Sequence, residues 1–352
     1  MSTGATMAMP AQATPSVRTS KSRPAMRFAV AHDIPRMTEL LLRECERRRS
    51  LDPALWAVAG DARASIERAI TASLNPSAKA LPEFWVLAEA AGQIVGLSHA
   101  VIVPPPPIYA VEGRPGLILD DSFTLAEAPE GTSQELLAAT EAALKDMGAA
   151  GLIASCLENG PWRALFTAAG YEPVTLYMSK HSFAARPAVP STRPAGLDDV
   201  PAIIALSADH RATLQRLNSR FWTIHPEADQ RFGGWMRYNL GLTDRDMMVA
   251  GPPSAISGYL IAQPITSLHV PAGHDVAPIG IIDDFYATDF AQVARLANGG
   301  RGAAGLLAAG ERAFAARNVQ AALVVCPAAW ASKRALLTRA GYRTAKLWML
   351  KA

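Results

Sequence analysis

Two pairs of neighbouring aspartates stand at the ends of short apolar runs. Asp120 and Asp121 follow Gly-Leu-Ile-Leu, and Asp283 and Asp284 follow Gly-Ile-Ile. A carboxylate in such a place can accept a proton, and burial or a nearby like charge raises its pKa toward a useful value. Side chains alternate between the two faces of a strand, so only one aspartate of each pair can face a given cleft. The alternative is that both pairs are structural and bind backbone groups or an arginine.

A glycine-rich segment, Asn-Gly-Gly-Arg-Gly-Ala-Ala-Gly at residues 298–305, precedes an alanine-rich stretch with the character of a helix. Glycines let backbone N–H groups converge, and the helix that follows adds the positive end of its dipole. Together they predict an anion site suited to a pyrophosphate, to which Arg301 adds a charge-assisted contact. A flexible loop before a helix is the alternative interpretation.

These segments belong to an internal repeat. Leu-Phe-Thr-Ala-Ala-Gly-Tyr at residues 165–171 recurs as Leu-Leu-Thr-Arg-Ala-Gly-Tyr at 336–342, with a spacing of 171 residues. Repeats of a solenoid run about 20–50 residues, so this spacing indicates a domain duplication. We expect a disordered tail over residues 1–25, domains over 26–182 and 193–352, and a linker over 183–192.

Each half reads as the order β-α-α-β-β-β-α-β-α-β. Hydrophobic periodicity and turn residues support this reading. In the first half we expect strands near residues 28–31, 84–88, 94–101, 117–123, 151–156 and 174–180, and helices starting at 33 and over 62–74, 133–147 and 161–169. In the second half we expect helices over 201–217, 230–240, 302–317 and 331–340, and strands over 247–250, 255–264, 279–286, 321–326 and 345–350.

Composition limits the possible functions. Half of the 352 residues are hydrophobic, and the net charge of +3 is too small to argue for nucleic acid or a membrane as partner. Three cysteines give neither a disulfide framework nor a metal-type spacing, which favours a reducing, cytoplasmic setting. No apolar run approaches the roughly 18 residues that a membrane span needs.

The element order, the glycine loop between fourth strand and third helix, and the Ala-Gly-Tyr that ends the fourth helix resemble the GNAT acyltransferase superfamily. The resemblance covers both halves. In architecture the chain is similar to double-domain members of the superfamily, such as mycothiol synthase. It implies an α/β fold of two tandem domains, each with a mixed, mostly antiparallel sheet flanked by helices. The implied activity is transfer of an acyl group, most simply from acetyl-CoA, to an amine of a small molecule or protein. No metal is implied, and a homodimer is possible.

The resemblance also implies a coenzyme site. The segment 299–305 matches the family's pyrophosphate loop, except that Gly299 replaces a Gln or Arg. The corresponding run in the first half puts Glu130 where a basic residue is common, so the second half is favoured. The implied coenzyme contacts are Phe285, Ala287, Gly299, Gly300, Arg301, Gly302, Ala303, Ala304 and Gly305, with Gly131, Thr132 and Ser133 in the first half.

For catalysis, the resemblance implies Asp283 as the base, with Asp120 as its counterpart. The family's usual acid is a tyrosine, but its positions hold Phe166 and Leu337, so either water or Tyr286 takes this role. The segment that commonly covers the acceptor cleft contains Trp222 and His225, which become candidate substrate contacts, with Trp222 as plain core the alternative.

Two other interpretations stay open. The missing tyrosines and Glu130 also suit a non-catalytic module that binds or senses a ligand. Alternatively, the first half is a structural or dimerisation partner and the second half is the only enzyme.

Overall fold

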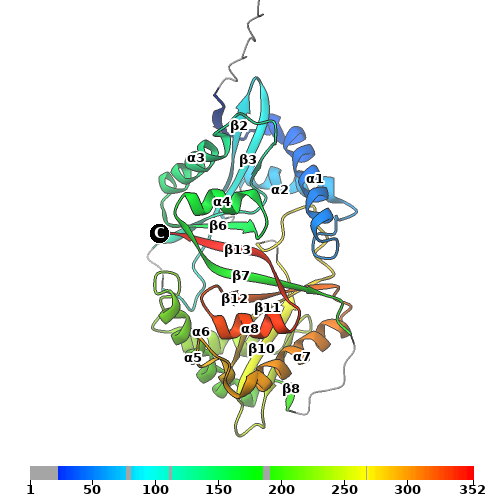
Figure 1. The fold of residues 1–352 in the computed structure, drawn as a ribbon, viewed down its shortest axis with the longest axis vertical. Coiled ribbons are helices and arrows are strands. Elements are labelled where there is room, and N and C mark those ends of the chain that lie inside the picture. The colour runs from blue at the N-terminus through cyan, green and yellow to red at the C-terminus, as the bar shows by residue number, and fades with distance from the viewer. Residues whose placement is uncertain (1–22, 77–80, 111–112, 185–190, 267) are drawn as a thin grey trace, which may run out of the picture.

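The computed structural model describes residues 23–76, 81–110, 113–184, 191–266 and 268–352. The expected tail therefore lies outside the described residues except for its last three positions, and Ala25 already belongs to a strand. Most of the expected linker, residues 185–190, also lies outside them. The molecule is elongated, with one half of the chain at each end and strands running across its middle (Figure 1).

The N-terminal half follows the predicted order. Its helices are α1 (Ile34–Leu51), α2 (Ala62–Leu74), α3 (Thr132–Asp146) and α4 (Pro161–Ala168). Its strands are β1 (Ala25–Phe28), β2 (Glu83–Ala90), β3 (Gln93–Ile102), β4 (Arg114–Ile118), β5 (Phe123–Thr124), β6 (Ala149–Leu157) and β7 (Tyr171–His181). Proline in the first turn of α1 and of α4 suits helix starts, where its missing N–H has no partner to lose.

The C-terminal half repeats this order. Its helices are α5 (Val200–Leu217), α6 (Ala228–Asn239), α7 (Arg301–Ala316) and α8 (Ala331–Arg339). Its strands are β8 (Thr192–Pro194), β9 (Asp246–Ala250), β10 (Gly258–Pro264), β11 (Ile279–Ala287), β12 (Ala321–Pro327) and β13 (Arg343–Lys351). Short 3₁₀ turns cover Ala31–Asp33, Leu197–Asp199, Thr288–Phe290 and Ala297–Gly300. The predicted order calls for a first strand in this half, but no residues were assigned to it; this strand is β8, a three-residue edge strand that begins where the linker was expected to end.

The two halves share one sheet and exchange their last strands. The strand order is β1-β2-β3-β4-β6-β13-β7-β12-β11-β10-β9-β8. The last strand of the chain, β13, pairs with β6 of the other half, and β7 in turn pairs with β12. The two exchanged strands pair with each other at the centre (Figure 1). Each half therefore completes the sheet of the other.

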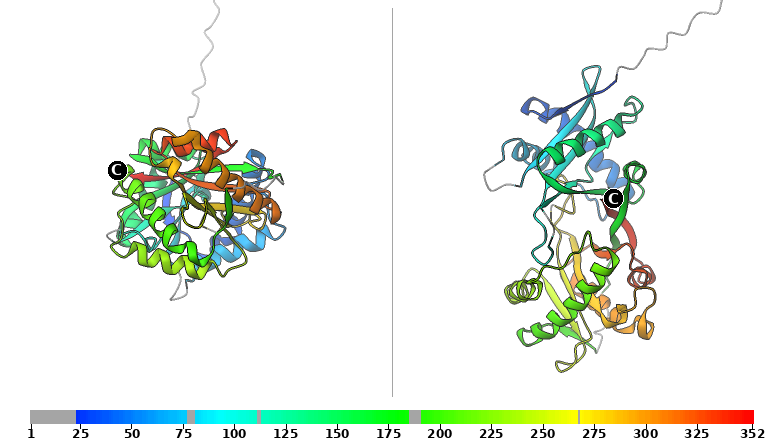
Figure 2. Two further views of the ribbon diagram at one scale, coloured as in Figure 1. Left: turned by 90° about the horizontal axis from the view of Figure 1, so that it is seen from below. Right: turned by 90° about the vertical axis from the view of Figure 1, so that its left-hand side faces the viewer.

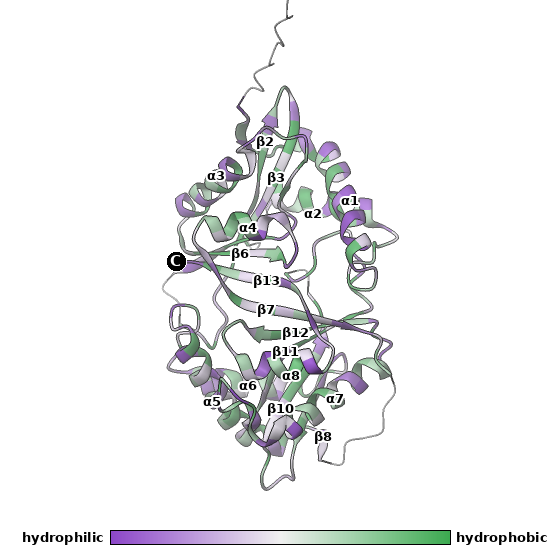
Figure 3. Ribbon diagram, in the orientation of Figure 1, coloured by the Kyte–Doolittle hydropathy of each residue, from purple (hydrophilic) through white to green (hydrophobic). Residues whose placement is uncertain are grey.

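Helices cover both faces of the N-terminal part of the sheet. Alternation along β2 puts Trp85 and Leu87 against α1 and α2, and Phe84 and Val86 on the face that α3 covers. Figure 2 shows the helices outside the strands at both ends of the molecule. Figure 3 shows many hydrophilic residues on α1, whereas β12 is mostly hydrophobic. Within the described ranges, no helix combines the length and apolar character that crossing a bilayer requires.

The strand predicted over residues 117–123 is interrupted. β4 ends at Ile118, the chain turns through Asp120 and Asp121, and β5 begins at Phe123. The turn closes with the Ser122 N–H donating to the Leu119 carbonyl at 3.2 Å. The expectation that strand alternation orients these aspartates is therefore wrong for this half. Because β4 ends while β6 continues, the sheet opens at this point.

The strand exchange predicts that neither half folds alone as a stable monomer. Without its partner, each half exposes a long unpaired edge and loses the apolar contacts of the central strands. If the chain is cut within residues 185–190 and both pieces are co-expressed, we expect a one-to-one complex by size-exclusion chromatography with mass detection. A monomeric single half with a cooperative thermal transition in circular dichroism would contradict this expectation.

Candidate active site

The parallel strand pairs give a common frame for comparing the halves. Ile118 of β4 and Ile282 of β11 hold the same register position against β6 and β12. Counted forward from these isoleucines, Asp120 stands at the position of Asp284. Counted back from the next antiparallel pairs, Leu97 with Phe123 and Tyr259 with Tyr286, Asp120 stands at the position of Asp283, as expected, because the first half has one residue more between the two pairings.

Asp120 is buried in an ion cluster that joins the two halves. The Nζ atom of Lys346, on β13, lies 2.6 Å from its carboxylate and donates to the His269 carbonyl at 2.8 Å. The Arg48 guanidinium donates to the Asp120 carbonyl and lies 3.7 Å from the carboxylate. Burial alone would raise the pKa of Asp120, but Lys346 and Arg48 hold that pKa below its usual range. A carboxylate held this way is a poor proton acceptor.

Asp121 is tied to a buried histidine. The Nδ1 atom of His99 lies 2.9 Å from Asp121, and its Nε2 atom lies 2.6 Å from Glu83. The ring also stacks on Trp85 at a centroid distance of 3.8 Å. Burial opposes the charged form, but the two carboxylates outweigh it and raise the pKa of His99 to about 9. Both ring nitrogens of His99 thus have carboxylate partners inside the fold.

In the second half, Asp284 is the tied aspartate. It accepts hydrogen bonds from the Tyr259 hydroxyl at 2.9 Å and lies 3.0 Å from Nδ1 of His210. Burial raises the pKa of Asp284, but these partners lower it overall. The His210 ring stacks on Tyr286 at 5.3 Å, and burial raises the pKa of that tyrosine. Tyr286 is thus packed in the interior, and its predicted role as an acid stays a prediction.

Asp283 differs from the other three aspartates. It is the extra residue of a bulge, because Ile261 of β10 faces Asp284 and the next residue of β10 faces Ile282. Its side chain is exposed to solvent, yet dense protein around it raises its pKa to about 6, with the charge of Asp284 adding to the effect. Its predicted role as a base therefore stays a prediction with a suitable pKa.

Side chains of α8 fill the gap between β11 and β12 in the second half. These strands pair only as far as Ile282, after which β11 continues alone. Lys333, 1% exposed, donates to the Phe285 carbonyl at 2.8 Å, and Trp330 beside it is fully buried. Phe285 and Ala287, predicted to contact a coenzyme, are themselves core residues.

The glycine loop has the predicted backbone shape, but a carboxylate of the protein itself binds the N-terminus of the helix that follows the loop. Gly299 and Gly300 take positive φ angles of 66° and 74°, and α7 begins at Arg301. The N–H of Ala303, in the first turn, donates to Asp289 at 2.8 Å. A Cβ atom on Gly302 would come within 3.0 Å of the same carboxylate. The predicted pyrophosphate site at residues 299–305 thus already holds an anion from the chain itself, and Ala304 and Gly305 lie on the helix behind it.

The equivalent helix start in the first half is open. α3 follows Gly131, which has φ of 83° and open space where a Cβ would stand. No side chain among the described residues caps this helix. Thr132 donates through its N–H to the Pro129 carbonyl at 3.2 Å, and the Ser133 hydroxyl lies 2.7 Å from that of Thr124. Unpaired N–H groups at such an end attract anions.

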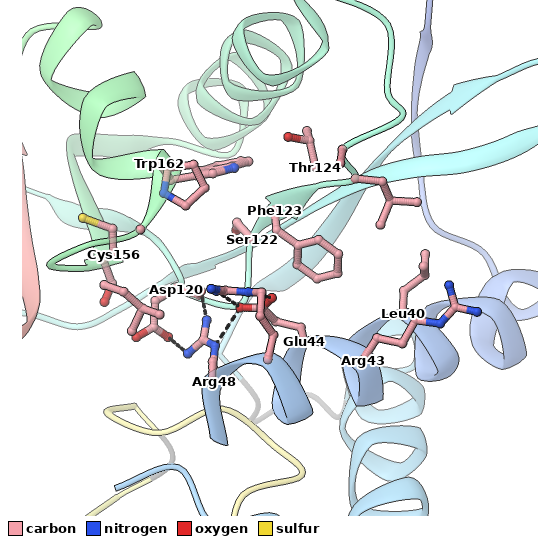
Figure 4. A pocket seen from close by; sticks show the side chains of 17 residues that line it. Leu40, Arg43, Glu44, Arg48, Asp120, Ser122, Phe123, Thr124, Cys156 and Trp162 are labelled. Carbon is pink, nitrogen blue, oxygen red and sulfur yellow. Dashed lines mark hydrogen bonds and ion pairs between the residues drawn. The ribbon is translucent and has the colours of Figure 1, made fainter. Parts of the chain in front are cut away.

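Two cavities adjoin this helix start. The first, about 510 Å³, passes through the opening between β5 and β6, from α1 on one face of the sheet to the start of α4 on the other (Figure 4). The second, about 540 Å³, lies between α3 and α4 and includes Ser133 and Gln134. Pro161 lines both, so the two spaces are neighbours.

Three residues that line the first cavity each carry a buried polar atom without a hydrogen-bond partner. The atoms are Nη1 of Arg48, Nε1 of Trp162 and Oγ of Ser155, whose residues are 1%, 5% and 2% exposed. All three can donate, and an unsatisfied buried donor costs about 1–3 kcal/mol. An acceptor oxygen that reached them would remove this cost.

The two predicted substrate contacts lie at the junction of the halves. Trp222 is 8% exposed and packs edge-on against Phe221 in the core, which is the alternative considered above. His225 donates through its backbone N–H to the Ile108 carbonyl at 3.0 Å, and its ring Nδ1 accepts from the Glu227 N–H. The first of these contacts joins the segment to Ile108 of the first half. Substrate contact by either residue stays a prediction.

Arg48, Lys346, Ser155 and Trp162 were not predicted from the sequence. Arg48 is the middle of three consecutive arginines, and nothing in that run marks it as the buried one, while Lys346 contacts Asp120 only because of the strand exchange. Trp162 carried a signal, since it stands in the first turn of the helix that ends in the repeated Gly-Tyr. In the described part of the chain, no three His, Cys, Asp or Glu side chains gather as a metal site would require.

Comparison with known proteins identifies the fold. No family model matches the chain, and no curated protein matches its sequence. Among solved structures, a GCN5-related N-acetyltransferase from Sphaerobacter thermophilus is 16% identical, covers 94% of this chain and 96% of its own, and has a TM-score of 0.51. A glucosamine N-acetyltransferase region of a fungal β-N-acetylglucosaminidase is 12% identical, covers 94% of this chain and 38% of its own, and has a TM-score of 0.51.

A tandem GNAT protein from the clavulanic acid biosynthesis pathway is 13% identical, covers 93% of this chain and 97% of its own, and has a TM-score of 0.47. The fold predicted from the sequence is confirmed: the chain has the tandem GNAT fold, with a mixed, mostly antiparallel sheet flanked by helices. At these identities the likeness concerns the fold.

Removing one partner of the central ion pair should destabilise the protein strongly. Lys346→Met leaves Asp120 buried without its closest cation, a change that typically costs about 3–5 kcal/mol of unfolding free energy. Adding Asp120→Asn should recover part of that loss, because the stranded charge is gone. Urea unfolding of the wild type, both single variants and the double variant measures the coupling, and strictly additive losses would contradict it.

The raised pKa of Asp283 predicts a pH-dependent stability difference. The pKa of this carboxyl is 3.8 in the unfolded chain and about 6 in the fold. As pH rises through this window, the unfolded chain ionises more readily than the fold, so the free energy of unfolding falls. Asp283→Asn removes that cost, so the variant should gain stability relative to wild type at pH 8 but not at pH 3.5. Urea unfolding at both pH values checks this, and an equal difference at the two would refute the raised pKa.

Proposed function

We propose that this protein is an acyltransferase that moves an acyl group, most simply acetyl, from acyl-coenzyme A to an amine, and that the donor binds in the N-terminal half. The observation that carries the placement is the contrast between two equivalent helix starts. Asp289 occupies that of α7, whereas that of α3 is uncapped beside two cavities. This reverses the preference for the second half that the glycine loop suggested.

The first half offers contacts that suit coenzyme A. Its pyrophosphate would lie at the first turn of α3, where Gly131 leaves room and Ser133 and Gln134 line the second cavity. Its pantetheine arm carries amide carbonyls, which would accept from the unpartnered donors of Ser155 and Trp162. Glu130 is exposed and lies outside the residues that line either cavity.

The reaction needs an unprotonated amine. A bound thioester supplies the activated acyl carbon; the amine nitrogen bonds to it, and the carbon–sulfur bond breaks to release a thiolate. Glu44 and Asp120, the two carboxylates in the cavity lining, are both held by arginine or lysine. We therefore propose that solvent takes the amine proton and later protonates the thiolate. Phe166, fully buried at the usual tyrosine position, has no proton to give.

The second half then supports the first. Its anion site and strand gap are filled by Asp289, Lys333 and Trp330, and its last strand supplies Lys346 to the ion cluster beside the cavity. A catalytic role for Asp283 requires that an acceptor reach it from the cavity, and it is kept as a second proposal. Three buried free cysteines suit a reducing compartment such as the cytoplasm.

The main alternative is a module that binds the same donor without turnover. The missing tyrosine and the tied carboxylates favour it. Thiol release in the presence of acetyl-CoA and a panel of amines separates the two, since the alternative binds acetyl-CoA but releases no thiol above the rate without protein.

A matched pair of charge insertions tests which half binds the donor. Gln134→Glu puts a carboxylate in the first turn of α3, where a negative charge favours the helix but repels a pyrophosphate. Ala304→Glu makes the same change in the first turns of α7, at an exposed position. By calorimetric titration with acetyl-CoA, we expect Gln134→Glu to weaken binding about tenfold or more and Ala304→Glu to leave it within twofold. The opposite result would return the donor site to the second half.

A further inference from the structure

We propose that the amine acceptor carries an anionic group, such as a carboxylate, and that Arg43 on α1 binds it. The inference rests on the proposed function, because it assigns the α1 end of the first cavity to the acceptor. The α4 end adjoins the second cavity and the open start of α3, where the donor would enter. The α1 end of the first cavity therefore remains open to the amine acceptor.

The lining of that mouth is basic. Arg43, Arg47 and Arg48 contribute three positive charges, and Glu44 and Asp120 contribute two negative ones. Lys346, fully buried behind Asp120, adds another positive charge 2.6 Å from its carboxylate. The local balance is positive before any ligand binds. Figure 4 shows Arg43, Glu44 and Arg48 on α1, across the cavity from Trp162.

Neither carboxylate is free to hold a cationic acceptor. Glu44 accepts from Arg47 through both oxygens, at 2.6 and 2.7 Å, and from Nε of Arg48 at 3.0 Å. Asp120 is matched by Lys346 and Arg48. A polyamine or an aminoglycoside would therefore place its charges against arginines without an available anion. Such an acceptor is disfavoured here.

One cationic group in this lining stays available to an anion. The guanidinium of Arg43 is exposed and bonds to none of the residues that the structure describes. Arg47 is occupied by Glu44, and Nη1 of Arg48 already lies 3.7 Å from the Asp120 carboxylate. A carboxylate or phosphate oxygen would pair with Arg43.

The same charges also assist the chemistry. Positive neighbours disfavour an ammonium ion, so they lower the pKa of the acceptor amine once it enters the cavity. An anionic group on the acceptor would offset the cost of bringing that amine into a basic site. Recognition and deprotonation are thus served by one set of side chains, which explains why the lining holds no free carboxylate.

The test uses matched probes that differ only in charge. Pairs of an α-amino acid and its amide, together with O-phosphoethanolamine and spermidine, are offered to the full-length protein with acetyl-CoA, and thiol release is followed. We expect turnover of the acids or of the phosphate ester, and little or none of the amides and spermidine. Arg43→Gln should raise KM for the best anionic acceptor roughly 3- to 10-fold, with kcat within twofold of wild type. Arg43→Lys keeps the positive charge, so its KM should lie between those of wild type and Arg43→Gln.

Arg49→Gln is the matched control, because Arg49 lies on the same helix, pairs with Glu46 and lines neither cavity. It should leave both constants unchanged. Preference for the amides or spermidine, turnover of no anionic probe, or equal effects of the Arg43 and Arg49 changes would each overturn the assignment. Calorimetric titration with acetyl-CoA separates failure of the proposed function from failure of the acceptor assignment. Absence of acetyl-CoA binding would overturn the proposed function. Acetyl-CoA binding together with any of those three outcomes would overturn only the acceptor assignment.

Discussion

The exchange of β7 and β13 is the constraint on which the rest of this structure depends. Because β13 lies between β6 and β7, Lys346 is placed against Asp120 of the other half. That contact, together with Arg48, fixes the turn at which β4 leaves the sheet. The opening beside this turn becomes the first cavity. The site of one half is therefore built partly from the end of the other.

The two halves show how one fold can diverge after duplication. Both have a glycine-preceded third helix and a gap beyond the end of the parallel pairing. In the second half, Asp289 satisfies the helix N-terminus, and Lys333 satisfies a carbonyl that the gap would leave free. Internal groups thus replace what a ligand would supply at these two places. Unpaired buried donors remain in both halves, among them the indole N–H groups of Trp162 and Trp330, and each is costly unless a ligand pairs with it.

The fold was largely predictable because local patterns determine it. Periodicity and end signals located α2 at the predicted residues and most other elements within a few residues. The site was less predictable, because its partners are distant in sequence. The glycine loop predicted the backbone shape correctly. Nothing in its sequence indicated that Asp289, 14 residues before Ala303, would accept the hydrogen bond at the start of α7. The aspartate pairs were visible, yet a bulge at Asp283 and a turn at Asp120 decided their surroundings.

The exchanged strands also set an order for biosynthesis. Cys156 on β6 contacts Met349 on β13, 193 residues later. During translation, this pairing of β6 cannot form until residues 343–351 have left the ribosome. An edge without its partner strand invites pairing with other chains, so loss of β13 would damage the half that was made first. The nine residues of β13 thus complete a domain whose other elements were translated long before.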